Sequence, residues 1–306
     1  MNANPKTASP SQPQSAFNFD PAEFGRKYNR APFLFRHNLV DHPLLQLPKL
    51  AELALRMDPQ HILHRSGRVP PDTNFDHAHE LHPARTSLAY TLEHIAESGS
   101  AVTINTPELD AEYKPFIASL YEEVRQATEP IDPGITYTAA YIFIAAPGSL
   151  TPYHMDREMN FLIHLRGKKV AQLWDPADPA VMSPEDVDQL FARFDIPRPG
   201  YRPELDAKAM TFDLLPGQGV HHPFIAPHLV RTTTELAISL AVTFRTRASD
   251  RIAQLHNVNH RLRKLGLAPR AVGTDPRADA AKLAAYHLGQ PVLGAAWRLA
   301  RRLGVR

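Results

Sequence analysis

The hydrophobic positions of this chain follow two different spacings on either side of residue 135. Before it, apolar side chains recur every three or four residues, which is the spacing of amphipathic helices. We expect helices over residues 41–57, 86–98 and 108–127, with a strand over 99–105. This part of the chain is therefore predicted to be mixed, with helices prominent.

From residue 135 to residue 246 the apolar runs become short and are separated by turns that contain glycine or proline. A helical insertion over 183–194 begins with a Ser-Pro-Glu-Asp start signal. Several short strands in succession favour a β-sandwich or jelly roll over a doubly wound sheet. The predicted strands cover residues 136–146, 159–165, 168–174, 209–215, 219–223 and 236–246.

These patterns divide the chain into four parts. Residues 1–17 are polar and proline-rich without an apolar signal core, so we expect a disordered leader. Residues 18–134 are expected to pack as a mixed helical part on a β core formed by residues 135–246. Residues 247–306 are helical and basic in pattern. Their last helix is predicted to pack on its own domain, to form a homodimer or to contact an anionic surface, and the sequence leaves these three open.

Composition narrows the possible functions. The chain has no cysteine, which excludes disulfides, thiolate metal sites and cysteine nucleophiles. The formal net charge is only +2, so we expect no nucleic-acid partner. No apolar run approaches the roughly 20 residues of a membrane helix, and the cytoplasm is the expected compartment.

His154 and Asp156 stand two positions apart, directly before a predicted strand. On extended backbone, positions i and i+2 lie on one face, so both side chains can reach one point. A third ligand from His221, His222 or His228 would complete a set of two histidines and one carboxylate, which suits Fe(II) and leaves positions open. His221 and His222 alternate faces, whereas His228 begins the next predicted strand. A surface or capping pair is the alternative interpretation of His-x-Asp.

Several fixed spacings agree with one known family. The stretches T-P-x-H-x-D (151–156), N-F-L (160–162), R-G-K-K (166–169) and L-W-D-P (173–176) occur in that order, followed by P-G-Q-G-V-x-x-P-x-x-x-P-H-x-V (216–230). Together they resemble the cupin-like branch of the JmjC family, the Fe(II)- and 2-oxoglutarate-dependent oxygenases that include an asparaginyl hydroxylase. The resemblance covers roughly residues 135–246 and, more loosely, the chain from residue 26 onward. It implies a double-stranded β-helix, also called a jelly roll.

The resemblance also implies a role for each matching residue. His154, Asp156 and His228 match the iron ligands. Lys169 matches the lysine that pairs with the distal carboxylate of 2-oxoglutarate, and Thr151 matches a hydroxyl that hydrogen-bonds the same carboxylate. This agrees with physical chemistry, because a carboxylate in a narrow desolvated slot needs a cation beside it.

Other residues match the pattern of this family less closely. Asn160 matches an asparagine near the cosubstrate and the metal, while Thr243 stands where the family often has asparagine. A tyrosine that some relatives use for 2-oxoglutarate has no fixed counterpart, and Tyr137 or Tyr141 can take its place. Arg245, on the same strand face as Thr243, is the rival of Lys169 for the distal carboxylate.

The expected activity is hydroxylation of a protein side chain or a small metabolite, with Fe(II) as cofactor and 2-oxoglutarate as cosubstrate. Demethylation through a hydroxymethyl product is left open. One alternative is a cupin-type metal enzyme that does not use 2-oxoglutarate, against which Lys169 and Thr151 argue. Another is a non-catalytic cupin-like binding module, against which the intact set of His154, Asp156 and His228 argues.

Overall fold

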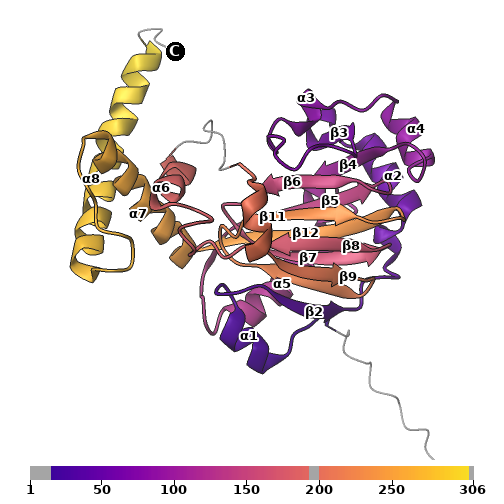
Figure 1. The fold of residues 1–306 in the computed structure, drawn as a ribbon, viewed down its shortest axis with the longest axis horizontal. Helices are drawn as coiled ribbons and strands as arrows, with labels where there is room; N and C mark the ends of the chain where they lie inside the picture. The colour runs from indigo at the N-terminus through magenta and orange to yellow at the C-terminus, as the bar shows by residue number, and fades with distance from the viewer. Residues whose placement is uncertain (1–14, 193–199, 303–306) are drawn as a thin grey trace, which may run out of the picture.

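The computed structural model describes residues 15–192 and 200–302, with side chains described as far as residue 289 (Figure 1). The predicted disordered leader, residues 1–17, lies almost entirely outside the described residues. The part of the last helix on which the dimer expectation rests lies beyond the described side chains. Both expectations stay predictions, as do the cytoplasmic compartment and the absence of a nucleic-acid partner.

Two antiparallel sheets form the centre of the molecule (Figure 1). Their strands are β1 (Phe17–Asn18), β2 (Phe33–His37), β3 (Ile62–Ser66), β4 (Ser100–Asn105), β5 (Ile135–Ala145), β6 (Leu150–His154), β7 (Met159–Arg166), β8 (Lys169–Leu173), β9 (Met210–Leu214), β10 (Gln218–His222), β11 (His228–Thr232) and β12 (Ala237–Thr246). The large sheet has the order β1-β2-β10-β7-β12-β5-β4-β3, and the small sheet has the order β6-β11-β8-β9. The coarse expectation of a mainly antiparallel β core with helices around it is confirmed.

The helices lie at the two ends of the chain and in one insertion. They are α1 (Pro21–Lys27), α2 (Leu47–Arg56), α3 (Ala78–Leu81), α4 (Leu88–Glu93), α5 (Lys114–Thr128), α6 (Pro184–Ala192), α7 (Arg247–Lys264) and α8 (Pro276–Arg302). The α5 helix begins later than the predicted residue 108, because Pro107 starts a separate 3-10 turn and a proline stands in the first turn of α5 itself. The α7 helix begins with a capping box between Thr246 and Ser249.

Four strands of the large sheet come from the part of the chain before residue 135. On one side β2 pairs with β10, and on the other side β4 pairs with β5 and β3 pairs with β4. The predicted division at residue 134/135 stays a prediction, but the large sheet crosses it. The mixed helical part therefore supplies strands that widen the central sheet as well as helices.

The two faces of the large sheet carry different side chains. Its outer face is aromatic: Phe17, Phe35 and Phe161 are in ring contact, and Phe24 of α1 stacks on Phe161. The two sheets meet through a second apolar cluster, against which Tyr141, Phe143 and Phe212 pack: Leu162, Ala171, Leu173, Leu214, Val220, Val230 and Ala241. Polar side chains also line the space between the sheets.

The C-terminal helices extend to one side of the sheets, and α8 projects from the body of the molecule (Figure 1). The α7 helix packs against α6 around Asp188, whose side chain is only 1% exposed. His256 Nδ1 lies 2.7 Å and Arg263 Nε lies 2.8 Å from its two oxygens. A satisfied buried carboxylate therefore fastens the C-terminal helices to the insertion.

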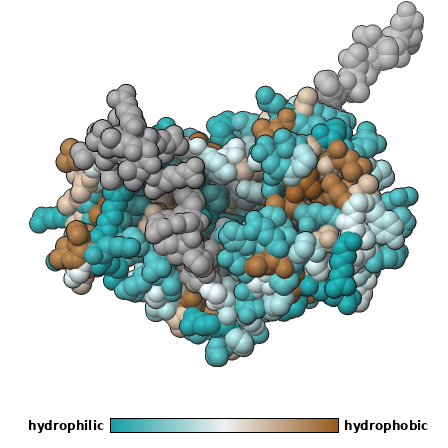
Figure 2. Space-filling view, turned by 90° about the horizontal axis from the view of Figure 1, so that it is seen from above, coloured by the Kyte–Doolittle hydropathy of each residue, from teal (hydrophilic) through white to brown (hydrophobic). Residues whose placement is uncertain are grey.

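No described helix combines the length and the apolar character that crossing a membrane would require. The face seen in Figure 2 is mainly hydrophilic, with smaller hydrophobic areas between the hydrophilic ones.

Candidate metal centre

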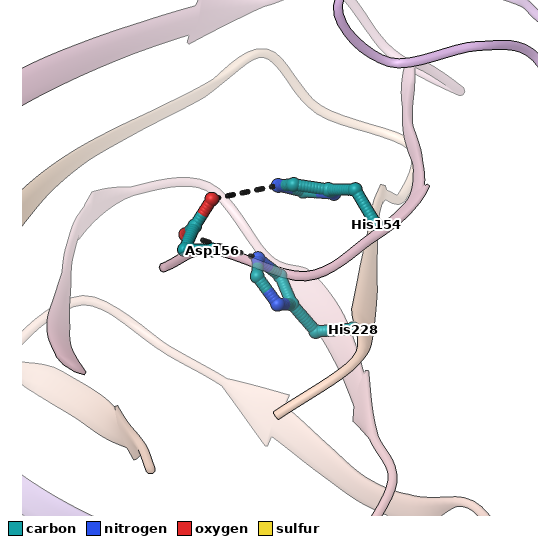
Figure 3. Close-up of side chains that lie close together, drawn as sticks. All are labelled: His154, Asp156 and His228. Atoms are coloured by element: carbon teal, nitrogen blue, oxygen red, sulfur yellow. Dashed lines mark ion pairs between the residues drawn. The ribbon is translucent and has the colours of Figure 1, made fainter. Parts of the chain in front are cut away.

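Three predicted side chains meet at one end of the small sheet. His154 ends β6 and His228 begins β11, and the two residues are direct cross-strand partners. Asp156 follows in the connection to β7. One oxygen of Asp156 lies 3.8 Å from His154 Nε2 and the other lies 3.8 Å from His228 Nε2 (Figure 3). The candidate ligand atoms all lie within 4.8 Å of one another.

Backbone contacts fix which nitrogen of each imidazole faces Asp156. His154 Nδ1 lies 2.8 Å from the carbonyl oxygen of Pro152, and His228 Nδ1 lies 3.0 Å from that of Ala226. A carbonyl only accepts, so Nδ1 carries a proton in each ring, and in the neutral imidazole the lone pair is then on Nε2. Both lone pairs are on the side of Asp156. Two neutral imidazole nitrogens and one carboxylate are donors that suit Fe(II), so the residues present fit the expected metal.

A phenylalanine holds one of these rings in place. Phe75 lies parallel to His154, with 3.6 Å between ring centroids and an interplanar angle of 5°. It belongs to the connection between β3 and α3, far from His154 in sequence. No sequence signal pointed to Phe75, because nothing in a loop sequence shows which strand end it covers.

The pairing of the strands places further polar residues at the level of the metal ligands. In the large sheet, His222 of β10 and Thr243 of β12 are the direct partners of Asn160 of β7. We call this row, together with His154 and His228 on the small sheet, the metal layer. All five residues line one or both of two adjoining hollows described below.

Lys169 lies deeper between the sheets. It is four positions from Leu173 on β8, and Leu173 is the partner of His228. Positions separated by two and four share a face, so Lys169 faces inward on the same side as Leu173. The pocket between the sheets, called here the inner pocket, therefore has the metal layer at one end and Lys169 at the other. Its polar lining residues are Thr151, His154, Asn160, Lys169, His222 and His228.

A bulge brings Thr151 into the inner pocket. His228 pairs with His154, but Val230 pairs with Thr151, so β6 has one residue more than β11 between these pairs. Residues three apart on a regular strand point to opposite faces, and the extra residue corrects this. As a result Thr151 and His154 both line the inner pocket. Their spacing of three fits the predicted pair of roles only because of this irregularity.

Lys169 is a buried cation without an acidic partner. The residue is 4% exposed, and burial lowers the pKa of its ammonium to about 7. Within the described part of the chain, no carboxylate lies in ion-pair range of Nζ, and the ring of Phe143 lies 5.7 Å from it. Lys168 points outward and pairs with exposed Asp213 at 3.2 Å. An unpaired buried charge is costly, which indicates a site for an anionic ligand.

Arg245, the alternative to Lys169 as partner of the distal carboxylate, contacts other residues. Arg245 stacks over the ring of Tyr137 at 4.5 Å and lies 3.6 Å from Asp250. It does not line the inner pocket. Thr243 donates its hydroxyl hydrogen to the carbonyl oxygen of Ala139 at 2.6 Å, so this hydroxyl is already engaged.

A larger hollow, called here the outer cavity, adjoins the inner pocket. It has a volume of about 250 Å³ and shares Phe143 and Thr151 with the inner pocket. Asp156 borders it, and its other polar residues include Thr243 and Tyr141, one of the two tyrosines that the sequence suggested. The triad therefore stands between a narrow pocket with a buried cation and a wider hollow.

One further cation in the outer cavity was not predicted. Arg65 of β3 donates to the carbonyl oxygens of Ser66 and Leu150 at 2.8 Å each, and burial lowers its pKa to about 10. The strand β3 was not predicted, so nothing placed Arg65 near the triad.

The two other histidines of the second ligand segment point to opposite sides. His221 faces outward, where its Nε2 accepts from the backbone N–H of Asn29 at 3.1 Å and its Nδ1 donates to the Asn160 carbonyl oxygen at 3.1 Å. His222 faces inward. The structure thus brings His228, and not His221 or His222, together with His154 and Asp156.

Comparison with known proteins gives remote likenesses to solved structures. No family model matches the sequence, and no curated protein matches it. An X-ray structure of YcfD from Escherichia coli is similar at 17% identity with a TM-score of 0.49, over 90% of this chain and 69% of that chain. A crystal structure of the Escherichia coli ribosomal oxygenase YcfD gives 17% identity and a TM-score of 0.45, over 90% and 68%. YcfD in complex with cobalt and 2-oxoglutarate gives 17% and 0.43, over 88% and 66%. Values at this level assign neither a family nor an activity to this chain.

Proposed function

We propose that this protein is an Fe(II)- and 2-oxoglutarate-dependent oxygenase that hydroxylates a protein side chain or a small metabolite. One observation carries the proposal: a two-histidine, one-carboxylate cluster and a buried, unpaired lysine line the same narrow pocket. The cluster suits a divalent iron, and the lysine suits the second carboxylate of a dicarboxylic keto acid.

Each residue then has a defined task. His154, Asp156 and His228 hold the iron, which when bound supplies open positions for chelation and for dioxygen. Lys169 pairs with the distal carboxylate of 2-oxoglutarate, and the hydroxyl of Thr151 donates a hydrogen bond to it. The apolar side chains between the sheets exclude water from the pocket, which strengthens both interactions.

We also propose that the two sheets form a double-stranded β-helix. From β5 to β12 the chain changes sheet at every connection except the one between β8 and β9. This arrangement places the ends of β6 and β11 at the mouth of the space between the sheets, where His154 and His228 stand.

The outer cavity is the proposed substrate site, because it borders Asp156 and joins the inner pocket. A cupin-type enzyme that binds no anionic ligand would leave Lys169 buried and unpaired throughout its cycle. The unpaired ammonium therefore favours the oxygenase over that alternative.

The test is formation of succinate from 2-oxoglutarate by protein loaded with Fe(II), first alone and then with candidate peptides and metabolites. We expect slow succinate formation without substrate and faster formation with the right one. Asp156→Ala should abolish both. Iron binding without any 2-oxoglutarate binding would support the cupin-type enzyme, and absence of iron binding would support the binding module.

A further inference from the structure

His222 is a buried histidine whose polar atoms are unused. The residue is 2% exposed, and neither ring nitrogen has a hydrogen-bond partner within the described residues. A buried polar group without a partner costs about 1–3 kcal/mol. Its neighbour His221 uses both ring nitrogens, so burial in this segment does not by itself leave an imidazole unsatisfied.

The position of His222 in the metal layer puts these nitrogens next to a candidate metal ligand. Its side chain lines the inner pocket, and its ring stands edge-on to that of His228 with 4.4 Å between centroids. It is not part of the candidate ligand cluster. Lys169 stands at the far end of the same pocket, so His222 faces the end of a bound ligand that lies nearest the metal.

A second unused polar atom lies directly beside it. Asn160 is the cross-strand partner of His222, and its side-chain oxygen is also buried without a hydrogen-bond partner among the described residues. The imidazole of His222 carries at least one N–H donor in either protonation state. The N–H of His222 can therefore donate to an acceptor of the ligand, whereas the Asn160 oxygen only accepts and does not itself contact a carboxylate.

We propose that His222 is a positioning residue that donates a hydrogen bond to the carboxylate next to the keto group of 2-oxoglutarate. This inference rests on the proposed function. It divides the recognition of the cosubstrate into two separate contacts, with His222 at the keto-acid end and Lys169 at the distal carboxylate. The ligand is then held at both ends before any substrate arrives.

The first experiment compares two replacements of His222 in metal-loaded protein. His222→Phe keeps a ring of similar size but has no donor, whereas His222→Gln keeps a donor. Anaerobic calorimetry with Mn(II)-loaded protein measures the affinity for 2-oxoglutarate. A hydrogen bond to a charged group is worth about 1.5–3 kcal/mol, so we expect affinity to fall about ten- to hundredfold in His222→Phe. We expect His222→Gln to recover most of that loss.

Truncated ligands show which end His222 contacts. Pyruvate keeps the keto acid and lacks the distal carboxylate, whereas 4-oxopentanoate keeps the distal carboxylate and has a methyl group in place of the other. Competition with 2-oxoglutarate on the Mn(II)-loaded protein measures the affinity for each of these two ligands. His222→Phe should lower the affinity for pyruvate and leave that for 4-oxopentanoate unchanged. Lys169→Met should lower the affinity for 4-oxopentanoate and leave that for pyruvate unchanged.

Thermal unfolding of the metal-free protein separates positioning from folding. His222→Phe removes two unsatisfied nitrogens, so the melting temperature should stay equal or rise. Equal loss of affinity for all three ligands, or a lower melting temperature, would overturn the inference. If the wild type binds 2-oxoglutarate in a Lys169-dependent way but His222→Phe binds it equally well, only this inference fails. If the wild type binds no 2-oxoglutarate, the proposed function fails as well.

Discussion

Two buried charges in this molecule stand in opposite situations. Asp188, between α6 and α7, is 1% exposed and is bonded on both oxygens by His256 and Arg263. Lys169, between the sheets, is 4% exposed and has no acidic partner in the described residues. The first charge is satisfied by the fold and holds elements together. The second is left to be satisfied by something that binds, and this difference separates a structural buried charge from a functional one.

The satisfied charge should affect stability alone. Replacing Asp188 by Asn leaves His256 and Arg263 facing a neutral group, and removal of one partner from a buried pair costs about 3–5 kcal/mol. We expect the free energy of unfolding in denaturant to fall by that amount, with 2-oxoglutarate affinity unchanged below the unfolding transition. Glu185→Gln is the matched control, because Glu185 pairs with the same arginine at the surface and should cost well under 1 kcal/mol. If Asp188→Asn and Glu185→Gln lowered the free energy of unfolding equally, the buried carboxylate would not have the structural role given to it here.

The unpaired charge should show the opposite profile. Lys169→Met removes the partner of the distal carboxylate, so 2-oxoglutarate affinity should fall by about a hundredfold or more in calorimetry. The same change removes a desolvated ammonium, and the free energy of unfolding should rise by about 2–4 kcal/mol at pH 7. Lys168→Met, at the exposed neighbouring position, should change neither quantity. A lower free energy of unfolding in Lys169→Met would mean that Lys169 stabilises the folded protein.

The pH dependence follows from the lowered pKa of Lys169. Burial lowers this pKa from 10.5 to about 7, so between these values the unfolded chain holds a proton that the folded chain lacks. Stability should therefore rise with pH across this window, and Lys169→Met should lose that rise. Cosubstrate affinity should move the other way, falling up to about tenfold per pH unit above pH 8, because the carboxylate needs the ammonium form. Affinity that stays constant between pH 7 and pH 9 would contradict the pairing.

The smallest effect is expected at Arg245. Its guanidinium stacks on Tyr137 and lies near Asp250, outside the inner pocket. Arg245→Gln should change 2-oxoglutarate affinity less than about twofold in the same calorimetric assay. If Arg245→Gln lost as much 2-oxoglutarate affinity as Lys169→Met, Arg245 would be a partner of the distal carboxylate.

Local spacing explains what the sequence could predict. Most strands from residue 135 onward were predicted, because short apolar runs alternate with turn residues, although β6 was not among the predicted ranges. His154 and Asp156 were visible as a pair because two positions on extended backbone share a face. Spacing alone left His221, His222 and His228 as candidates for the third ligand, and the family resemblance pointed to His228. Pairing between strands far apart in sequence decides such a choice, and periodicity does not report it.

The parts that were missed depend on contacts between distant segments. Thr151 was predicted through the family resemblance, but the bulge that brings it into the inner pocket is not foreseen by a regular alternation. Phe75 and Arg65 come from a loop and a strand of the N-terminal part, and only the folded sheet brings them beside the triad. His222 was visible as a histidine, but its two unsatisfied nitrogens are a property of the packed pocket.

The most direct test is an anaerobic crystal structure with Mn(II) and 2-oxoglutarate bound. We predict one metal ion on His154 Nε2, His228 Nε2 and the carboxylate of Asp156, with one ligand carboxylate within hydrogen-bond distance of Lys169 Nζ. A metal ion elsewhere, or a ligand carboxylate on Arg65 or Arg245 with Lys169 still unpaired, would contradict the account.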